Sequence, residues 1–163
     1  MTWRLIGALA ALVVFGAVPG RIAAQEPLVA NAPLPTAALT LTAKGQPHRY
    51  TVELARTEVE QARGLMLRKT MARERGMLFP MDPPRAAAFW MEGTYLPLDI
   101  IFIAPDRTVL HIAADAVPFS RENIPSGGLT AAVLELGAGE AARIGLQPGD
   151  RVSYTLDEAP QRR

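Results

Sequence analysis

Two carboxylates lie within apolar stretches that have the pattern of strands. Asp99 follows Leu98 and precedes a run of isoleucine and phenylalanine, and Glu135 stands between two leucines. Burying a carboxylate without a partner is costly, so each needs solvent or a binding partner. If both face one cleft, Asp99 and Glu135 are candidate catalytic residues, an acid/base pair suited to carbohydrate hydrolysis. If they are structural, we expect Asp99 to form an ion pair with Arg68.

An aromatic block supplies further candidate binding residues. Trp90 lies beside Phe89 and near Tyr95. The flat face of a tryptophan ring can stack on a sugar ring, although such a residue often anchors a core instead. Tryptophan is also enriched at binding hot spots. The candidate ligand-binding patch consists of Trp90, Met91, Thr94, Asp99 and Arg68.

Several methionines lie close together in the sequence and suggest an alternative chemistry. In an exported protein, soft thioethers can bind Cu(I). No tight Met-x-Met repeat is present, however, and methionine is an ordinary gap-filler in cores. His48 and His111 are far apart and adjoin no cluster of carboxylates, so we predict neither a metal centre nor a cofactor. The methionines are Met66, Met71, Met77, Met81 and Met91.

Composition excludes other classes of function. The chain has 163 residues, a formal net charge of +1 and no cysteine, which rules out disulfides and thiol catalysis. Basic and acidic residues are interspersed, so nucleic-acid binding has no electrostatic basis. Ser120 and Ser126 lack the Gly-x-Ser-x-Gly pattern of an activated serine, and no phosphate-binding loop is present.

The N-terminal segment has the pattern of a secretory signal. Arg4 precedes an uncharged run, 5–18, that is short for a membrane span, and small residues precede a cleavage site after Ala24. We predict a signal peptide over residues 1–24 and a proline-rich tether over 25–36. The protein is then periplasmic or secreted, and it contacts the membrane only if the signal segment stays uncleaved.

The remaining chain predicts a single β-rich domain over residues 37–157, followed by a tail over 158–163. Alternating apolar patterns and regularly spaced turns indicate a mainly β sandwich or barrel-like fold with one or two short helices. Prolines 80, 83 and 84 should end one strand before the next begins. About eight short strands are expected, at 37–42, 50–54, 76–79, 86–91, 98–104, 109–113, 132–136 and 151–156.

Two short helices complete the prediction. Thr57 and Glu60 have the spacing of a capping box, which predicts a helix over about 58–63 that ends at Gly64. Residues 139–144 are expected to form at most two further helical turns. The segment 124–128 is expected to be a loop.

Four sequence blocks carry a family resemblance. They are Gly64-Leu65-Met66-x-Arg68; Gly76-Met77-Leu78-Phe79; Phe89-Trp90-Met91-x-x-Thr94-x-x-Pro97-Leu98-Asp99-x-x-Phe102; and Leu134-Glu135-x-x-x-Gly139 with Gly149-Asp150 after it. Their order and spacing over about residues 50–152 resemble the domain of unknown function 192 family. The resemblance implies a compact, β-rich domain of a kind commonly exported by bacteria, and no particular reaction.

One departure from the family pattern concerns ligand contacts. After the Trp-Met pair the family usually carries a basic residue and an asparagine, whereas this chain has Glu92 and Gly93. The charge is reversed and an amide is lost, which puts any ligand contact through those two side chains in question.

These observations predict an exported, non-enzymatic binding or accessory domain. We expect a monomer that recognises a cell-envelope glycan or a protein partner through the patch around Trp90. A carbohydrate hydrolase that uses Asp99 and Glu135 is one alternative, and periplasmic copper binding by methionines is another.

Overall fold

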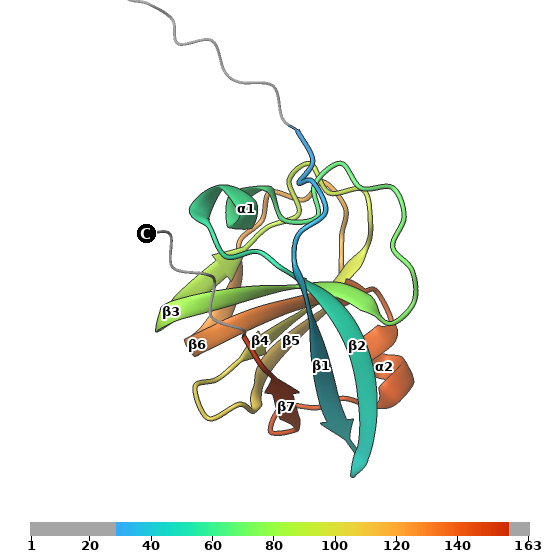
Figure 1. Cartoon of the computed structure of the whole chain (residues 1–163), viewed down its shortest axis with the longest axis vertical. Coiled ribbons are helices and arrows are strands. Elements are labelled where there is room, and N and C mark those ends of the chain that lie inside the picture. Colours follow the sequence, from blue (N-terminus) through green and yellow to red (C-terminus); the bar gives the residue numbers. More distant parts are fainter. Residues whose placement is uncertain (1–28, 157–163) are drawn as a thin grey trace, which may run out of the picture.

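The computed structural model describes residues 29–156, which form seven strands and two short helices (Figure 1). The predicted signal peptide, 1–24, and the predicted tail, 158–163, lie outside the described residues. In chain order the elements are β1 (Thr36–Ala43), β2 (Gln46–Leu54), α1 (Glu58–Arg63), β3 (Arg75–Phe89), β4 (Leu98–Ile103), β5 (Val109–Ala116), β6 (Ile124–Gly137), α2 (Glu140–Ile144) and β7 (Arg151–Tyr154).

All seven strands belong to one curled sheet with the order β5-β4-β6-β3-β2-β1-β7. Neighbouring strands are antiparallel except β2 and β3, whose connection through α1 allows them to run parallel. The two outer strands approach each other, because Thr108 bridges to Arg151 and the amide of Val152 donates to the carbonyl of Arg107 at 2.9 Å. The resulting half-barrel confirms the prediction of a mainly β, barrel-like fold.

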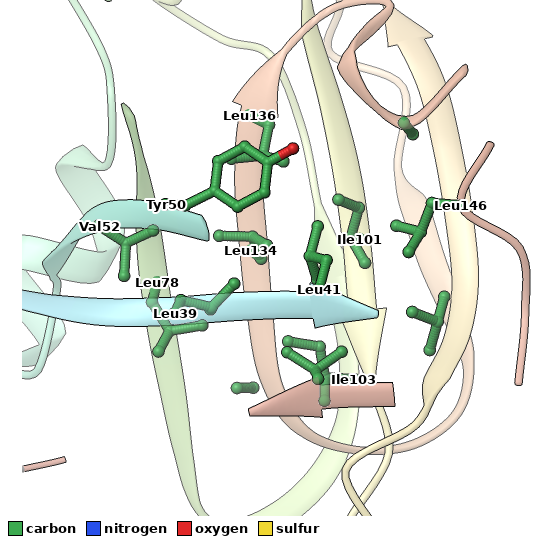
Figure 2. Packing of buried hydrophobic residues seen from close by; sticks show 14 of the residues in the cluster. Leu39, Leu41, Tyr50, Val52, Leu78, Ile101, Ile103, Leu134, Leu136 and Leu146 are labelled. Carbon is green, nitrogen blue, oxygen red and sulfur yellow. The ribbon is translucent and has the colours of Figure 1, made fainter. Parts of the chain in front are cut away.

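The inner face of the half-barrel is filled by aliphatic side chains. Alternate residues of β1 and β2 are buried, as expected for strands with one face on a core. Figure 2 shows Leu41, Ile101 and Leu134 pointing toward one another from β1, β4 and β6. The interior is therefore a packed core, and any ligand site has to lie elsewhere.

A second cluster covers the outer face of β3, β4 and β6. Three phenylalanine rings pack edge to face in this cluster, with centroid distances of 5.1 Å from Phe79 to Phe89 and 6.1 Å from Phe89 to Phe102. Leu65, just after α1, packs into the same cluster. All six residues of β4 are buried because both faces of the sheet are covered here, as its continuous apolar run indicates.

The structure corrects the number and the bounds of the strands. The expected strands at 76–79 and 86–91 form one continuous strand, β3, and β6 begins at Ile124, where a loop was expected. Beyond its first four residues β3 pairs only with β6, and their register shifts between Pro80 and Arg85. Prolines are tolerated at such irregular positions of a strand with one free edge, so seven strands replace the expected eight.

Both helices occur where the sequence predicts them. The Thr57 hydroxyl accepts from the Glu60 amide at 3.2 Å, and the Glu60 carboxylate accepts from the Thr57 amide at 2.9 Å, which confirms the capping box. Gly64 ends α1 with a φ of 46°, a conformation that favours glycine. Over residues 29–156 no helix is both long and apolar enough to cross a membrane.

The close approach of β3 to β6 predicts that Gly76 cannot be replaced. A Cβ atom at Gly76 would overlap the carbonyl oxygen of Glu135 and approach Cδ2 of Leu136 to 2.7 Å. Because that oxygen belongs to a central strand, we expect Gly76→Ala to lower the free energy of unfolding by about 2–3 kcal/mol. Gly137→Ala is the matched control, since its Cβ would meet only the Met71 methyl group at 3.9 Å. Equal stability of the two variants in urea would contradict this packing.

Candidate ligand-binding pocket

Asp99 is fully buried and binds backbone amides rather than an arginine. Its Oδ1 accepts from the amides of Asp115 at 2.9 Å and Gly139 at 3.2 Å, and its Oδ2 accepts from the amide of Ala141 at 2.8 Å. Two of these donors lie at the first turn of α2, so Asp99 caps that helix from a neighbouring strand. Three amide donors stabilise the carboxylate without a cation. The expected pair of Asp99 with Arg68 is therefore wrong.

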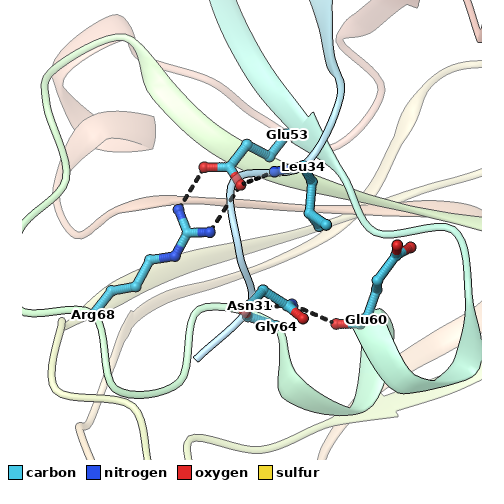
Figure 3. Close-up of polar contacts among 6 residues, drawn as sticks. All are labelled: Asn31, Leu34, Glu53, Glu60, Gly64 and Arg68. Atoms are coloured by element: carbon cyan, nitrogen blue, oxygen red, sulfur yellow. Dashed lines mark hydrogen bonds and ion pairs between the residues drawn. The ribbon is translucent and has the colours of Figure 1, made fainter. Parts of the chain in front are cut away.

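Arg68 instead forms a bidentate ion pair with Glu53 of β2 (Figure 3). Its Nη2 donates to Oε2 of Glu53 at 2.8 Å, and its Nη1 donates to Oε1. The guanidinium lowers the pKa of Glu53, and the amide of Leu34 also donates to this carboxylate at 3.1 Å. Asp99 is not available to Arg68 because the amides around α2 already occupy its oxygens.

The described part of the predicted tether, from residue 29 to 36, is bound to the domain. The side-chain amide of Asn31 donates to the carbonyls of Glu60 at 2.9 Å and Gly64 at 3.1 Å (Figure 3). Leu34 packs against the outer hydrophobic cluster. From Asn31 onward this segment is part of the packed structure and holds the end of α1.

Glu135 points to the opposite face of the sheet from Asp99. In the pairing of β4 with β6, Glu135 lies opposite Ile100 and Asp99 lies opposite Leu136. Because successive side chains of a strand alternate between faces, Glu135 faces the outer cluster while Asp99 faces α2. The two carboxyl groups do not share a cleft. The prediction of a catalytic carboxylate pair is therefore wrong, and the hydrolase alternative that rested on it fails.

One oxygen of the Glu135 carboxyl group is buried without a partner among the described residues. The residue is 5% exposed, and its Oε2 has no hydrogen-bond partner among the described residues. Burial raises the pKa of Glu135 to about 8, so the carboxyl group is mostly protonated at neutral pH. An unsatisfied buried polar atom costs about 1–3 kcal/mol. A ligand that supplies the missing hydrogen bond would remove this cost.

Glu135 lines a pocket of about 360 Å³ on the outer face of the sheet. The end of α1 with the turn after it forms one wall, and the second half of β3 forms another. All four sequence blocks contribute lining residues, for example Met66, Phe79, Trp90 and Glu135. Glu135 is buried and Trp90 is 49% exposed, which places Glu135 at the closed end and Trp90 at the mouth.

Three of the predicted site residues line this pocket: Trp90, Thr94 and Glu135. The other three do not. Met91 is fully buried in the outer cluster, and Arg68 lines a separate surface hollow with Glu53. Asp99 lies on the opposite face. The aromatic block is thus divided between the pocket and the core.

Sequence reasoning missed two arginines. Arg63, in the last turn of α1, and Arg85, in β3, both line the pocket. Neither has a carboxylate within ion-pair distance in the part of the chain that the structure describes. Arg63 directly precedes the sequence block that begins at Gly64, and this position could have indicated that it lies near the site. Arg85 follows prolines that were assigned to a turn, so nothing indicated that it faces a site.

The methionines mainly fill the outer face. Met77 and Met91 are fully buried in the outer cluster, whereas Met66 and Met81 line the pocket. Residues 29–156 contain no group of three or more His, Cys, Asp or Glu side chains placed to hold a metal ion. Four of the five methionines are thus buried side chains of the outer face.

Glu92 and Gly93, which depart from the family pattern, have structural roles. Glu92 pairs with Arg121 at 2.5 Å. Gly93 has a φ of 65°, and its carbonyl accepts from the amide of Leu67 at 2.9 Å. Asparagine is the common alternative to glycine in this left-handed conformation. The backbone conformation therefore explains why Gly93 can stand where the family usually has an asparagine. Neither residue lines the pocket.

The chain is similar to a protein family and to two solved structures. The model of the DUF192 family, described as an uncharacterised ACR, matches residues 39–154. A protein of unknown function from Novosphingobium aromaticivorans DSM 12444 is 48% identical, with 74% of this chain and 86% of that chain covered and a TM-score of 0.72. A protein of Sinorhizobium meliloti 1021, described as a candidate transcription regulator, is 42% identical over 76% and 97% of the two chains, with a TM-score of 0.74. No curated protein matches.

The capping role of Asp99 predicts a loss of stability on substitution. In Asp99→Asn one accepting oxygen becomes a donating NH₂ group that faces amide donors, so we expect the free energy of unfolding to fall by roughly 2–4 kcal/mol. The control is Asp115→Asn, because Asp115 is exposed and its φ of 56° suits asparagine. Thermal unfolding compares the two variants. An unchanged melting temperature for Asp99→Asn would contradict the capping role.

Burial of Glu135 predicts that stability depends on pH. Its pKa is raised from 4.5 to about 8 in the folded protein, so the folded state holds a proton that the unfolded state loses. The stability that this proton contributes is complete below pH 4.5, declines as pH rises, and is lost above about pH 8. The loss is on the order of 5 kcal/mol. We expect Glu135→Gln to show a smaller decline between pH 5 and 8 in urea unfolding. If the free energy of unfolding declines equally with pH in Glu135→Gln and in the parent protein, the carboxyl group is not buried and protonated.

Proposed function

This chain belongs to the DUF192 family, and on that premise we propose that it is a binding domain whose pocket over Glu135 holds a sugar unit of a cell-envelope glycan. The single observation that carries the proposal is that Glu135, whose Oε2 has no hydrogen-bond partner among the described residues, lines this pocket. A protein interior rarely leaves such a group unsatisfied. A ligand hydroxyl group would supply the missing partner.

The mouth of the pocket suits a flat, amphipathic ligand. Trp90 is half exposed and adjoins Phe89, which also lines the pocket. A sugar presents axial C–H groups to an aromatic face and hydroxyl groups at its edge. The buried hydroxyl of Thr94 lines the same pocket. These features support stacking at the mouth with hydrogen bonding deeper inside.

The pocket favours a small ligand over a protein partner. Glu135 is almost completely buried, so a flat protein surface would not reach its unpartnered oxygen. The N-terminal sequence pattern supports export. An exported protein would meet sugar units mainly in the glycans of the cell envelope. We therefore place the protein in the cell envelope as a binding or accessory domain.

Tryptophan emission tests the proposal. Trp3 and Trp90 are the two tryptophans of the chain, so the full chain with Trp3→Phe reports on Trp90 alone. Titration with N-acetylglucosamine and with N-acetylmuramic acid should produce a saturable change in emission with at least one sugar. Glu135→Leu should abolish this response while the melting temperature stays the same or rises, because an unsatisfied polar group has been removed.

The control variant is Glu74→Gln, an exposed acid that lines a different surface hollow. It should bind as the parent does. If neither sugar changes the emission of Trp90, or if Glu135→Leu binds as well as the parent, the proposed function is wrong.

A further inference from the structure

We infer that the ligand of this pocket is an acidic sugar, whose carboxylate binds Arg63 and Arg85 while a hydroxyl group reaches Glu135. The inference rests on the function proposed above and adds the charge of the ligand. It is carried by two cations and one unpartnered polar group that line the same pocket.

The two arginines are available to a ligand. Arg143, on α2, is paired with Glu140 at 2.6 Å, whereas Arg63 and Arg85 have no carboxylate within ion-pair distance among the described residues. Arg63 is partly buried as a whole residue and lines the pocket. Guanidinium groups bind carboxylates with two parallel hydrogen bonds, which makes a carboxylate the fitting partner.

The arginines and Glu135 recognise different ends of the ligand. Desolvation is the cause of the raised pKa of Glu135, and no cation offsets it. Neither arginine lies within ion-pair distance of the Glu135 carboxyl group, so the arginines stand apart from Glu135. Arg85 is exposed and Glu135 is buried, which gives the pocket a cationic mouth and an uncharged, hydrogen-bonding closed end.

The cationic mouth and the uncharged closed end disfavour cationic and neutral ligands. A ligand with an ammonium group would have to pass two arginines and then ionise Glu135. A neutral sugar would satisfy Glu135 but leave both guanidinium groups without a counter-ion. A sugar with a carboxylate at one side and hydroxyl groups at the other satisfies both ends, with its ring against Trp90 as proposed above.

Matched pairs of sugars test the inference in the full chain with Trp3→Phe. N-acetylmuramic acid and N-acetylglucosamine differ by a lactyl carboxylate, and glucuronate and glucose differ by one carboxylate. We expect the acidic member of at least one pair to bind about tenfold more tightly, as read from the emission of Trp90. The pair that shows the preference distinguishes a muramic acid from a uronic acid.

Variants at the mouth test the assignment of the two arginines. Arg63→Gln with Arg85→Gln should remove the preference for the acidic sugar, so that the two members of a pair bind within about twofold of each other. Arg49→Gln, at an exposed position of β2 that lines another hollow, is the control for net charge and should keep the preference. Circular dichroism melting verifies that the double variant is folded.

The outcomes separate the inference from the proposed function. Equal binding of acidic and neutral sugars, or a preference that survives the double arginine variant, overturns the inference while the binding function stands. Absence of any response to all four sugars overturns both. Loss of the preference in the double variant but not in Arg49→Gln supports the inference.

Discussion

Strand β6 has to be buried on both faces, and this constraint governs the rest of the structure. The strand lies between β3 and β4, with the packed interior on one side and the outer cluster on the other. All residues from Ala132 to Leu136 are buried. A polar group in this part of the sheet cannot reach bulk water, so it needs a partner from the protein or from a ligand.

The two buried carboxyl groups meet this constraint in opposite ways. Asp99 accepts three backbone hydrogen bonds and thereby joins β4 to Asp115 of β5 and to the start of α2. It stabilises the fold, is fully buried and faces away from the pocket. Glu135 faces the other way, has an oxygen without a partner among the described residues, and lines a pocket. One carboxyl group stabilises the fold, and the other is the buried polar group on which the proposed function rests.

The pocket lies on the outer face because the half-barrel interior is already full. Aliphatic side chains occupy the interior (Figure 2), whereas the outer face is covered by α1 and connecting segments that leave a gap beside β3. Asn31 and the ion pair of Arg68 with Glu53 hold these covering segments (Figure 3). Residues from all four sequence blocks meet at this gap, so the blocks describe one site as well as a core.

Local patterns in the sequence determined the strand-rich fold, the capped helix at Thr57 and the burial of the apolar run at Leu98, because each depends on neighbouring residues. Only the tertiary structure decided that Arg68 pairs with Glu53, that β3 continues through its prolines beside β6, and that Asp99 and Glu135 face opposite ways. The physical reason is register. A shift of one residue between paired strands reverses the face of every side chain, and no pattern within a single strand specifies its register against a partner that is distant in sequence.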